Sequence, residues 1–309
     1  MLLMIGVAVF AGIASSVSAI AYRWGENHRI NVVQICTVAS AVSAVFFALK
    51  VLHRSPVNVP FWVIVIGAVG GLSMYGVVRL FGIALARGPL SPAWCAMMLA
   101  FVPVILCSDV FFGEKLHGVQ HLGVLAAVSS VLVGSLQHRH DRPVEARRGT
   151  TGTYAAILVL LFGMNGVGPV CIKYLTIWSG AGPMDANRDL FLVAFFAVGT
   201  VFLVADLMVT QGLRGHRGWW AVLGAMASFG AIVSMWAQCK AAVLPAAVVF
   251  TVCGMSALVT VTVASVALFR EKITAALVIM LVLGVAAIML VNFPTLWQVL
   301  AAKEASGAI

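Results

Sequence analysis

Long runs of apolar residues, separated by short polar segments, dominate this chain. A helix that crosses a bilayer needs about 20 apolar residues, and usually between 17 and 25. The pattern predicts ten such helices, at residues 2–21, 31–50, 61–85, 91–112, 118–136, 153–176, 189–210, 218–239, 243–268 and 273–293. Most connections are short, so consecutive helices are expected to be antiparallel neighbours. The sequence therefore predicts an all-α integral membrane protein with ten transmembrane helices.

The one long polar segment divides the predicted helices into two sets of five. Because five is an odd number, the second set enters the bilayer upside down relative to the first. This predicts two inverted five-helix repeats, related by a two-fold axis in the membrane plane. We expect a first repeat at 1–137, a basic linker at 138–152, a second repeat at 153–294 and a C-terminal tail at 295–309.

A weak internal similarity supports this division. The pair Glu114-Lys115 stands between two apolar runs, and Glu271-Lys272 stands in the same setting 157 residues later. Other residues recur at this offset or, beyond the charged pair, at an offset of 161: Gly67 with Gly224, Ser108 with Ser265, and Gly123 with Gly284. A period this long indicates a duplicated half-protein, as in secondary transporters, and not a solenoid.

Composition and charge agree with a membrane protein. The chain is 62% hydrophobic and 9% charged, whereas soluble domains carry roughly 25% charged residues. We therefore assign the net charge of +9 to loops that contact lipid headgroups, and we expect no nucleic-acid partner. No nucleotide-binding GxxxxGK[ST] motif occurs. The expectation is a carrier with a small-molecule substrate in the bilayer, with no cofactor, no metal and no enzymatic activity.

Three features lie close together in the first half: the run ALARGPLSPAW at 84–94, Pro103, and the Glu-Lys pair before the fifth predicted helix. They resemble the EamA-like domain of the drug/metabolite transporter superfamily. The resemblance covers nearly the whole chain as two tandem domains, although Thr260 stands where the second half should have its proline. It implies a ten-helix secondary carrier in the cell membrane with both termini in the cytoplasm. The distribution of Lys and Arg over the loops favours the opposite orientation.

Arg79 is the most conspicuous candidate for substrate binding. It lies six residues before the end of the third predicted helix, roughly 9 Å inside that end. Burying it costs about 2.5–3.5 kcal/mol on insertion scales. Tyr75 lies one turn earlier on the same face, and Trp236 holds the matching place in the second half. With no acidic partner expected at its depth, Arg79 is predicted to anchor an anionic substrate group; the alternative is snorkelling to headgroups.

The sixth predicted helix carries a second candidate feature. A proline removes a helical hydrogen bond, and nearby glycines lower the cost of bending. The predicted helix break consists of Gly163, Gly166, Gly168 and Pro169. Packing of helices at the glycines is the alternative. The predicted substrate-binding residues are Arg79, Tyr75, Asn165, Trp94, Trp236, Ser15 and Ser16. Trp94 could instead be an interfacial anchor, and the serine hydroxyls could bond to their own helix.

The sequence favours a secondary transporter of small polar metabolites, amino acids among them, that works by alternating access. Lipophilic cations fit poorly if the mid-membrane charge is positive and unbalanced. One alternative is a hydrophobic-drug efflux transporter in which Arg79 snorkels. Another is a metal-dependent membrane enzyme, because Glu114, His117 and His121 share one face of a helix start and could ligate a metal. The second half lacks the matching histidines.

Overall fold

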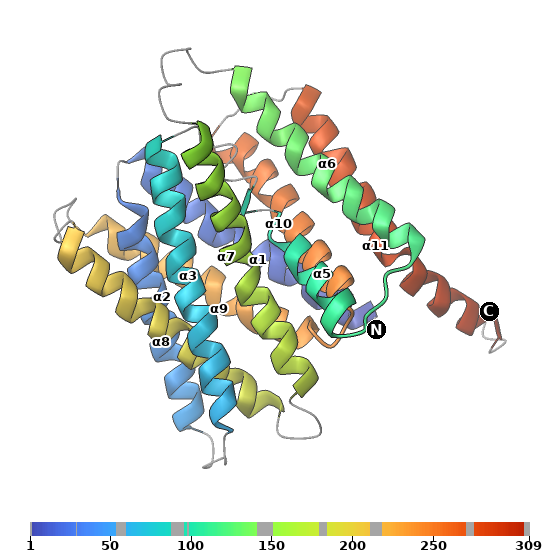
Figure 1. Cartoon of the computed structure of the whole chain (residues 1–309), viewed down its shortest axis with the longest axis horizontal. Coiled ribbons are helices and arrows are strands. Elements are labelled where there is room, and N and C mark those ends of the chain that lie inside the picture. The colour runs from blue at the N-terminus through green and yellow to red at the C-terminus, as the bar shows by residue number, and fades with distance from the viewer. Residues whose placement is uncertain are drawn as a thin grey trace.

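The described part of the chain is helical apart from short turns, and no strand occurs in it. The computed structural model describes residues 2–28, 30–53, 60–87, 96–97, 99–140, 151–178, 184–210, 218–269 and 275–305. The helices (Figure 1) are α1 (Leu2–Asn27), α2 (Val32–Leu52), α3 (Phe61–Arg87), α5 (Phe101–Phe111), α6 (Gly118–His140), α7 (Thr151–Trp178), α8 (Met184–Thr210), α9 (Trp219–Ala241), α10 (Ala246–Phe269) and α11 (Ala275–Ala305).

Within the described residues, seven helices are long and apolar enough to cross a membrane: α1, α2, α3, α7, α8, α9 and α10. Phe101–Phe111 and Val278–Pro294 are shorter apolar helices. Large apolar side chains point away from the protein, with Leu49, Met208, Val209, Phe229 and Met289 each more than 60% exposed. Exposed apolar surface on this scale is typical of a protein that contacts lipid. The predicted class, an all-α multi-pass membrane protein, is confirmed, while the ten crossings and their inversion stay predictions.

Several helices extend beyond their predicted ends. Helix α1 continues to Asn27, and α11 runs through Pro294 to Ala305, so most of the predicted tail at 295–309 is helical. The part of the predicted C-terminal tail that the structure describes, residues 295–305, thus continues α11, and the domain boundaries stay a prediction. Apolarity locates the part of a helix that lies in hydrocarbon, and a helix can continue beyond it.

The predicted fourth helix, 91–112, is not continuous. Residues 96–97 are helical, Leu99 and Ala100 form a turn, and α5 begins at Phe101. Pro103 then falls in the first turn of α5, where a missing N–H is tolerated. By contrast, α7 continues from Thr151 to Trp178 with Pro169 inside it. Among the described residues the turn therefore lies in the fourth predicted helix, while α7 has no gap at Pro169 and a bend there stays a prediction.

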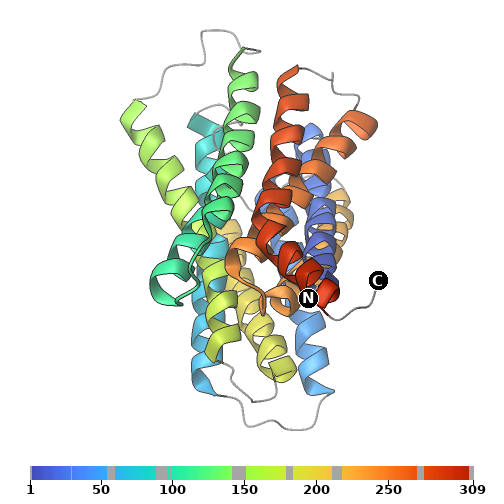
Figure 2. The same cartoon turned by 90° about the vertical axis from the view of Figure 1, so that its right-hand side faces the viewer.

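The two halves of the chain pack against each other along most of their length. Helix α2 packs on α8, α6 on α11, and α1 on both α9 and α10, while α3 packs on α7 and α8. Helices α6 and α11 lie side by side in both views (Figures 1 and 2). The main core joins the halves as well: the ring of Phe47 in α2 stacks on that of Phe196 in α8, with centroids 5.9 Å apart.

Candidate functional site

Arg79 has an acidic partner in the second half of the chain. Its Nη1 lies 3.4 Å from Oδ2 of Asp206 in α8, and the side chains are 34% and 6% exposed. The prediction that no acid lies at the depth of Arg79 is wrong. Both residues precede the C-terminal ends of their helices, Arg79 by eight residues in α3 and Asp206 by four in α8. The objection to lipophilic cations is removed too, because Asp206 balances the positive charge.

An aromatic contact lies one turn before this ion pair on each helix. The ring of Tyr75 stacks on that of Phe202, with centroids 5.5 Å apart and planes 29° apart. Residues four apart on a helix lie above one another, so the α3–α8 interface carries an aromatic layer beside a charged layer. Tyr75 therefore accompanies Arg79, as the sequence predicts.

Trp236 belongs to a different polar cluster. The Nζ of Lys240 lies 4.2 Å from the centroid of the Trp236 ring, and the Nζ of Lys50 lies 5.8 Å from it. Lys50 also donates a hydrogen bond to Oδ1 of Asp189 in α8, at 2.8 Å. The cation–π partners of Trp236 are thus two lysines, and Arg79 is engaged elsewhere.

Asn165 sits at the break between residues 97 and 101. Its Nδ2 donates to the carbonyl of Met97 at 2.7 Å. A Cβ atom at Gly166 would lie 2.8 Å from Cβ of Pro103, so α7 and α5 approach as closely as they do because residue 166 has no side chain. The amide of Asn165 thus bonds to a backbone carbonyl of the fourth predicted helix, and not to one in its own helix. Gly163 faces open space and Gly168 lies in ordinary contact with Phe195.

The serines of α1 bond to backbone carbonyls. Ser15 Oγ donates to Gly12 O at 2.7 Å, and Ser16 Oγ donates to the same carbonyl at 3.0 Å and to Ala257 O in α10 at 3.3 Å. These bonds match the alternative that the hydroxyls satisfy the backbone. Trp94 lies outside the described residues, so its role in substrate binding stays a prediction.

Glu114 forms a third ion pair between the halves, with a residue that the sequence analysis did not single out. Glu114 Oε1 pairs with Nζ of Lys173 in α7, and Glu114 Oε2 accepts a 2.8 Å hydrogen bond from the N–H of Ala246 at the start of α10. Lys173 is only 2% exposed and also donates to the carbonyls of Ala242 and Leu244, at 3.2 and 2.8 Å. The presence of a lysine within a predicted apolar helix could have identified Lys173 as a candidate for an ion pair.

This pairing bears on the metal hypothesis. Both carboxylate oxygens of Glu114 are engaged, and the Nδ1 of His121 contacts the carbonyl of His117 at 3.1 Å. No group of three or more His, Cys, Asp or Glu side chains suited to a metal ion occurs among the described residues. The three predicted ligands therefore do not converge on one point.

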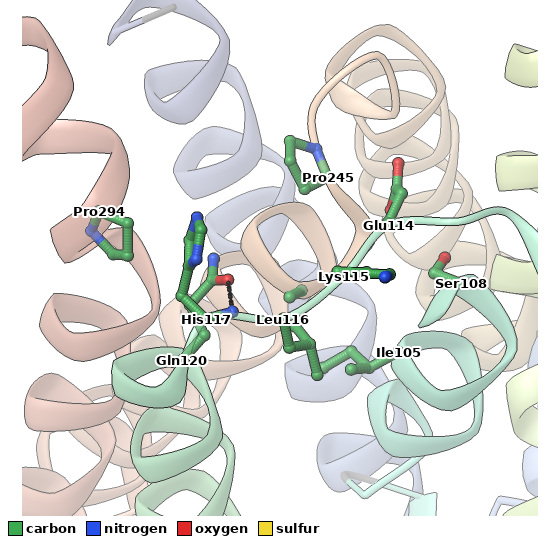
Figure 3. Close-up of a pocket in the computed structure, with 10 residues that line it drawn as sticks. Ile105, Ser108, Glu114, Lys115, Leu116, His117, Gln120, Pro245 and Pro294 are labelled. Atoms are coloured by element: carbon green, nitrogen blue, oxygen red, sulfur yellow. Dashed lines mark hydrogen bonds between the residues drawn. The ribbon is translucent and has the colours of Figure 1, made fainter. Parts of the chain in front are cut away.

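A cavity of about 210 Å³ lies beside Glu114 (Figure 3). Its lining residues are Ile105, Ser108, Glu114, Lys115, Leu116, His117, Gln120, Pro245, Ala247 and Pro294. They come from α5, the connection to α6, the first turn of α6, the start of α10, and α11. None of the predicted substrate-binding residues belongs to this lining.

Fold and site together define a multi-pass, all-helical membrane protein with charged pairs where the first half of the chain meets the second. Comparison with protein families finds no match, and comparison with curated proteins finds none. A protein of known crystal structure has a similar fold, with a TM-score of 0.68 and 16% sequence identity. The similarity covers 94% of this chain and 97% of that one. At this identity the likeness concerns the fold alone.

Proposed function

We propose that this chain is a secondary transporter of the drug/metabolite type that moves small zwitterionic metabolites, such as amino acids, by alternating access. The observation that carries the proposal is the Arg79–Asp206 pair, a partly exposed cation and an acid contributed by different halves of the chain. Binding between two halves that move relative to each other is the working principle of such carriers.

Matched helix contacts support the two inverted repeats that the proposal requires. A Cβ atom at Gly67 in α3 would lie 2.7 Å from Cβ of Ala194 in α8. A Cβ atom at Gly224 in α9 would lie 2.5 Å from Cβ of Val38 in α2. Gly67 and Gly224 are 157 residues apart, and Val38 and Ala194 are 156 apart. The α3–α8 and α9–α2 contacts are therefore counterparts, as a two-fold axis demands.

Two further sets of contacts follow the same rule. A Cβ at Gly12 would lie 2.8 Å from Cβ of Ser256, and one at Gly166 would lie 2.8 Å from Cβ of Pro103, which relates α1–α10 to α7–α5. Across α6 and α11, Gly123 meets Val291 and Gly284 meets Ser130, and both pairs are related by an offset of 161. On these contacts the counterpart of Pro103 is Ser256, four residues before the Thr260 that sequence alignment indicates.

At the candidate site the two proposed repeats carry different side chains at corresponding positions. Trp236 is the counterpart of Arg79 at the offset of 157, and Lys50 is the counterpart of Asp206 at the offset of 156. An ion pair on one side thus corresponds to a cation–π contact on the other, where Lys50 lies 5.8 Å from the ring centroid of Trp236. A carrier with one asymmetric substrate needs such a difference between its repeats.

A zwitterion suits the Arg79–Asp206 pair. The planar guanidinium binds a carboxylate through two parallel hydrogen bonds, so a substrate carboxylate can replace that of Asp206. The substrate ammonium then takes Asp206 as its partner. The Arg79 side chain is one-third exposed, so the pair is not closed off from a substrate.

Efflux of hydrophobic drugs is the second candidate function. The observation that favours it is the same pairing, because Asp206 makes the site neutral and could hold a lipophilic cation. In that case Arg79 is a structural partner of Asp206 and contacts no substrate.

Transport by variants in reconstituted vesicles separates the two functions. Arg79→Lys keeps the positive charge but loses the two parallel N–H donors of the guanidinium. We expect it to weaken binding of amino acids by about 1.5–3 kcal/mol, the range for hydrogen bonds to charged groups. The loss should be nearly absent for amino-acid methyl esters. Asp206→Asn should instead affect substrates with a free ammonium more than their N-acetyl derivatives.

The control is His53→Gln, at an exposed position after α2, which should transport normally. Equal losses for acids and esters contradict a role of Arg79 in binding the carboxylate. Transport of lipophilic cations that is lost in Asp206→Asn and retained in Arg79→Lys favours drug efflux.

A further inference from the structure

The cavity beside Glu114 plays no part in the proposed transport site, and its walls are shaped by a tight turn. Gly113 adopts a left-handed conformation, with φ of 68°, which L-residues with a side chain rarely adopt. The turn brings the N–H groups of Phe112 and Glu114 back to the carbonyl of Ser108, each at 3.1 Å. The connection is thereby fixed over the end of α5, with Lys115 and His117 on the cavity wall.

The electrostatics of the cavity favour an anion. Helices α6 and α10 both begin at its wall, at Gly118 and Ala246, and the N-terminus of a helix carries partial positive charge. Lys115 adds a full positive charge and forms no ion pair within the described part of the chain. The acid on the rim, Glu114, is already neutralised by Lys173 and receives the N–H of Ala246.

A buried hydroxyl provides an independent indication of a ligand. Ser108 is 2% exposed, and its Oγ has no hydrogen-bond partner among the described residues. Buried hydroxyl groups are normally hydrogen-bonded, since an unmade bond is unfavourable. Figure 3 shows the side chain of Lys115 extending toward the Ser108 hydroxyl. A bound group with acceptor oxygens would satisfy the hydroxyl.

We infer that this cavity binds a phosphate group. Phosphate offers several acceptor oxygens, which can be shared between Ser108 and Lys115, whose side chain extends toward Ser108 (Figure 3). The volume of about 210 Å³ is several times the ~30 Å³ that a water molecule occupies in the liquid, so a phosphate group fits.

The group can belong to an anionic lipid or to a free phosphate. Three exposed apolar side chains follow or precede lining residues by one to three positions on their helices: Phe111 is 76% exposed, Leu122 58% and Phe293 51%. They place the cavity next to acyl chains, in the setting where basic pockets between membrane helices bind lipid headgroups. The inference is independent of the transported substrate.

Thermal unfolding of the purified full-length protein in detergent tests the inference. One series adds inorganic phosphate, against chloride at equal ionic strength. The other adds phosphatidylglycerol, against phosphatidylcholine. We expect a saturable rise in Tm with at least one of the two phosphate probes. Lys115→Gln should raise the half-saturating concentration by about tenfold or more, and Ser108→Ala should raise it as well. His53→Gln is the matched control and should bind like the wild type.

The outcomes show whether the cavity binds a phosphate group and which molecule carries that group. A response to inorganic phosphate that weakens in Lys115→Gln and Ser108→Ala assigns the site to free phosphate. A response to phosphatidylglycerol alone, weakened by the same variants, assigns it to a lipid headgroup. Absence of any response in the wild type, or an equal response in wild type and both variants, overturns the inference.

Discussion

At the residue scale, three ion pairs among the described residues join the two halves of the chain. Lys50 pairs with Asp189, and Arg79 with Asp206. Glu114 and Lys173 form a third such pair, tied further to the backbone around Ala242–Ala246. In hydrocarbon an isolated charge is costly, so each pair stabilises the contact of the halves and restricts how they separate.

Lys173 shows this most clearly, because it is almost fully buried. Lys173→Met should remove the partner of Glu114 and leave the carbonyls of Ala242 and Leu244 without its donor. We expect a loss of about 1–3 kcal/mol in the free energy of unfolding, the cost of unsatisfied buried polar groups. The measurement is the Tm of the purified protein in detergent, which should be lower for the variant than for the wild type. Since Glu114 is 25% exposed, the loss should stay below the 3–5 kcal/mol of a fully buried pair.

The double variant Lys173→Met with Glu114→Gln is the control. It removes the uncompensated charge and should recover part of the lost stability. If the double variant is less stable than Lys173→Met alone, the ion pair is not the source of the effect.

Sequence reasoning identified Arg79 and Tyr75 at this scale but missed their partners. Arg79 is conspicuous because it is a cation in an apolar run. Asp206 lies near the end of another run and has an ordinary explanation there as an interfacial carboxylate. Only the packing of α3 on α8 brings the two together, and single-chain spacing does not determine the register between helices.

At the element scale, a proline in an apolar run does not by itself predict where a helix is interrupted. Pro103 falls in the first turn of α5, and the preceding residues form a turn. Pro169 lies inside α7, which continues around it. The sequence offered glycines beside Pro169 as a sign of a break, but Gly166 instead allows α7 to pack against Pro103. Glycine composition alone does not distinguish flexibility from close approach.

Two glycines of α7 test this distinction within one helix. An alanine at 166 would place its Cβ 2.8 Å from Pro103 Cβ, whereas nothing lies within 4 Å of the same atom at 163. Gly166→Ala should cost about 1–3 kcal/mol, as overpacking usually does. Gly163→Ala should be neutral or stabilising by up to about 1 kcal/mol, because alanine favours helices over glycine.

Thermal unfolding of the two variants under identical conditions measures the difference. A similar loss of Tm in both variants would show that α7 needs flexibility at its glycines and not close contact with α5.

At the scale of the whole molecule, α8 connects the two ends of the proposed carrier. Its carboxylates Asp189 and Asp206 are 17 residues apart, about 25 Å along the helix, and each pairs with a cation of the first half. Rocking of one half against the other would open one pair while the other stays closed. The sequence predicted the membrane class from apolarity alone, whereas these pairings depend on tertiary contacts.

Counterflow in reconstituted vesicles tests the central claim, that the protein is an alternating-access carrier of zwitterionic metabolites. Vesicles are loaded with one unlabelled amino acid at a time from a panel and diluted into a trace of the same labelled compound. A carrier that exchanges its substrate across the membrane accumulates label transiently above equilibrium. We predict this overshoot for at least one amino acid in the wild type and its loss in the double variant Arg79→Lys with Asp206→Asn. Equilibration without overshoot for every compound, by correctly folded protein, would contradict the account.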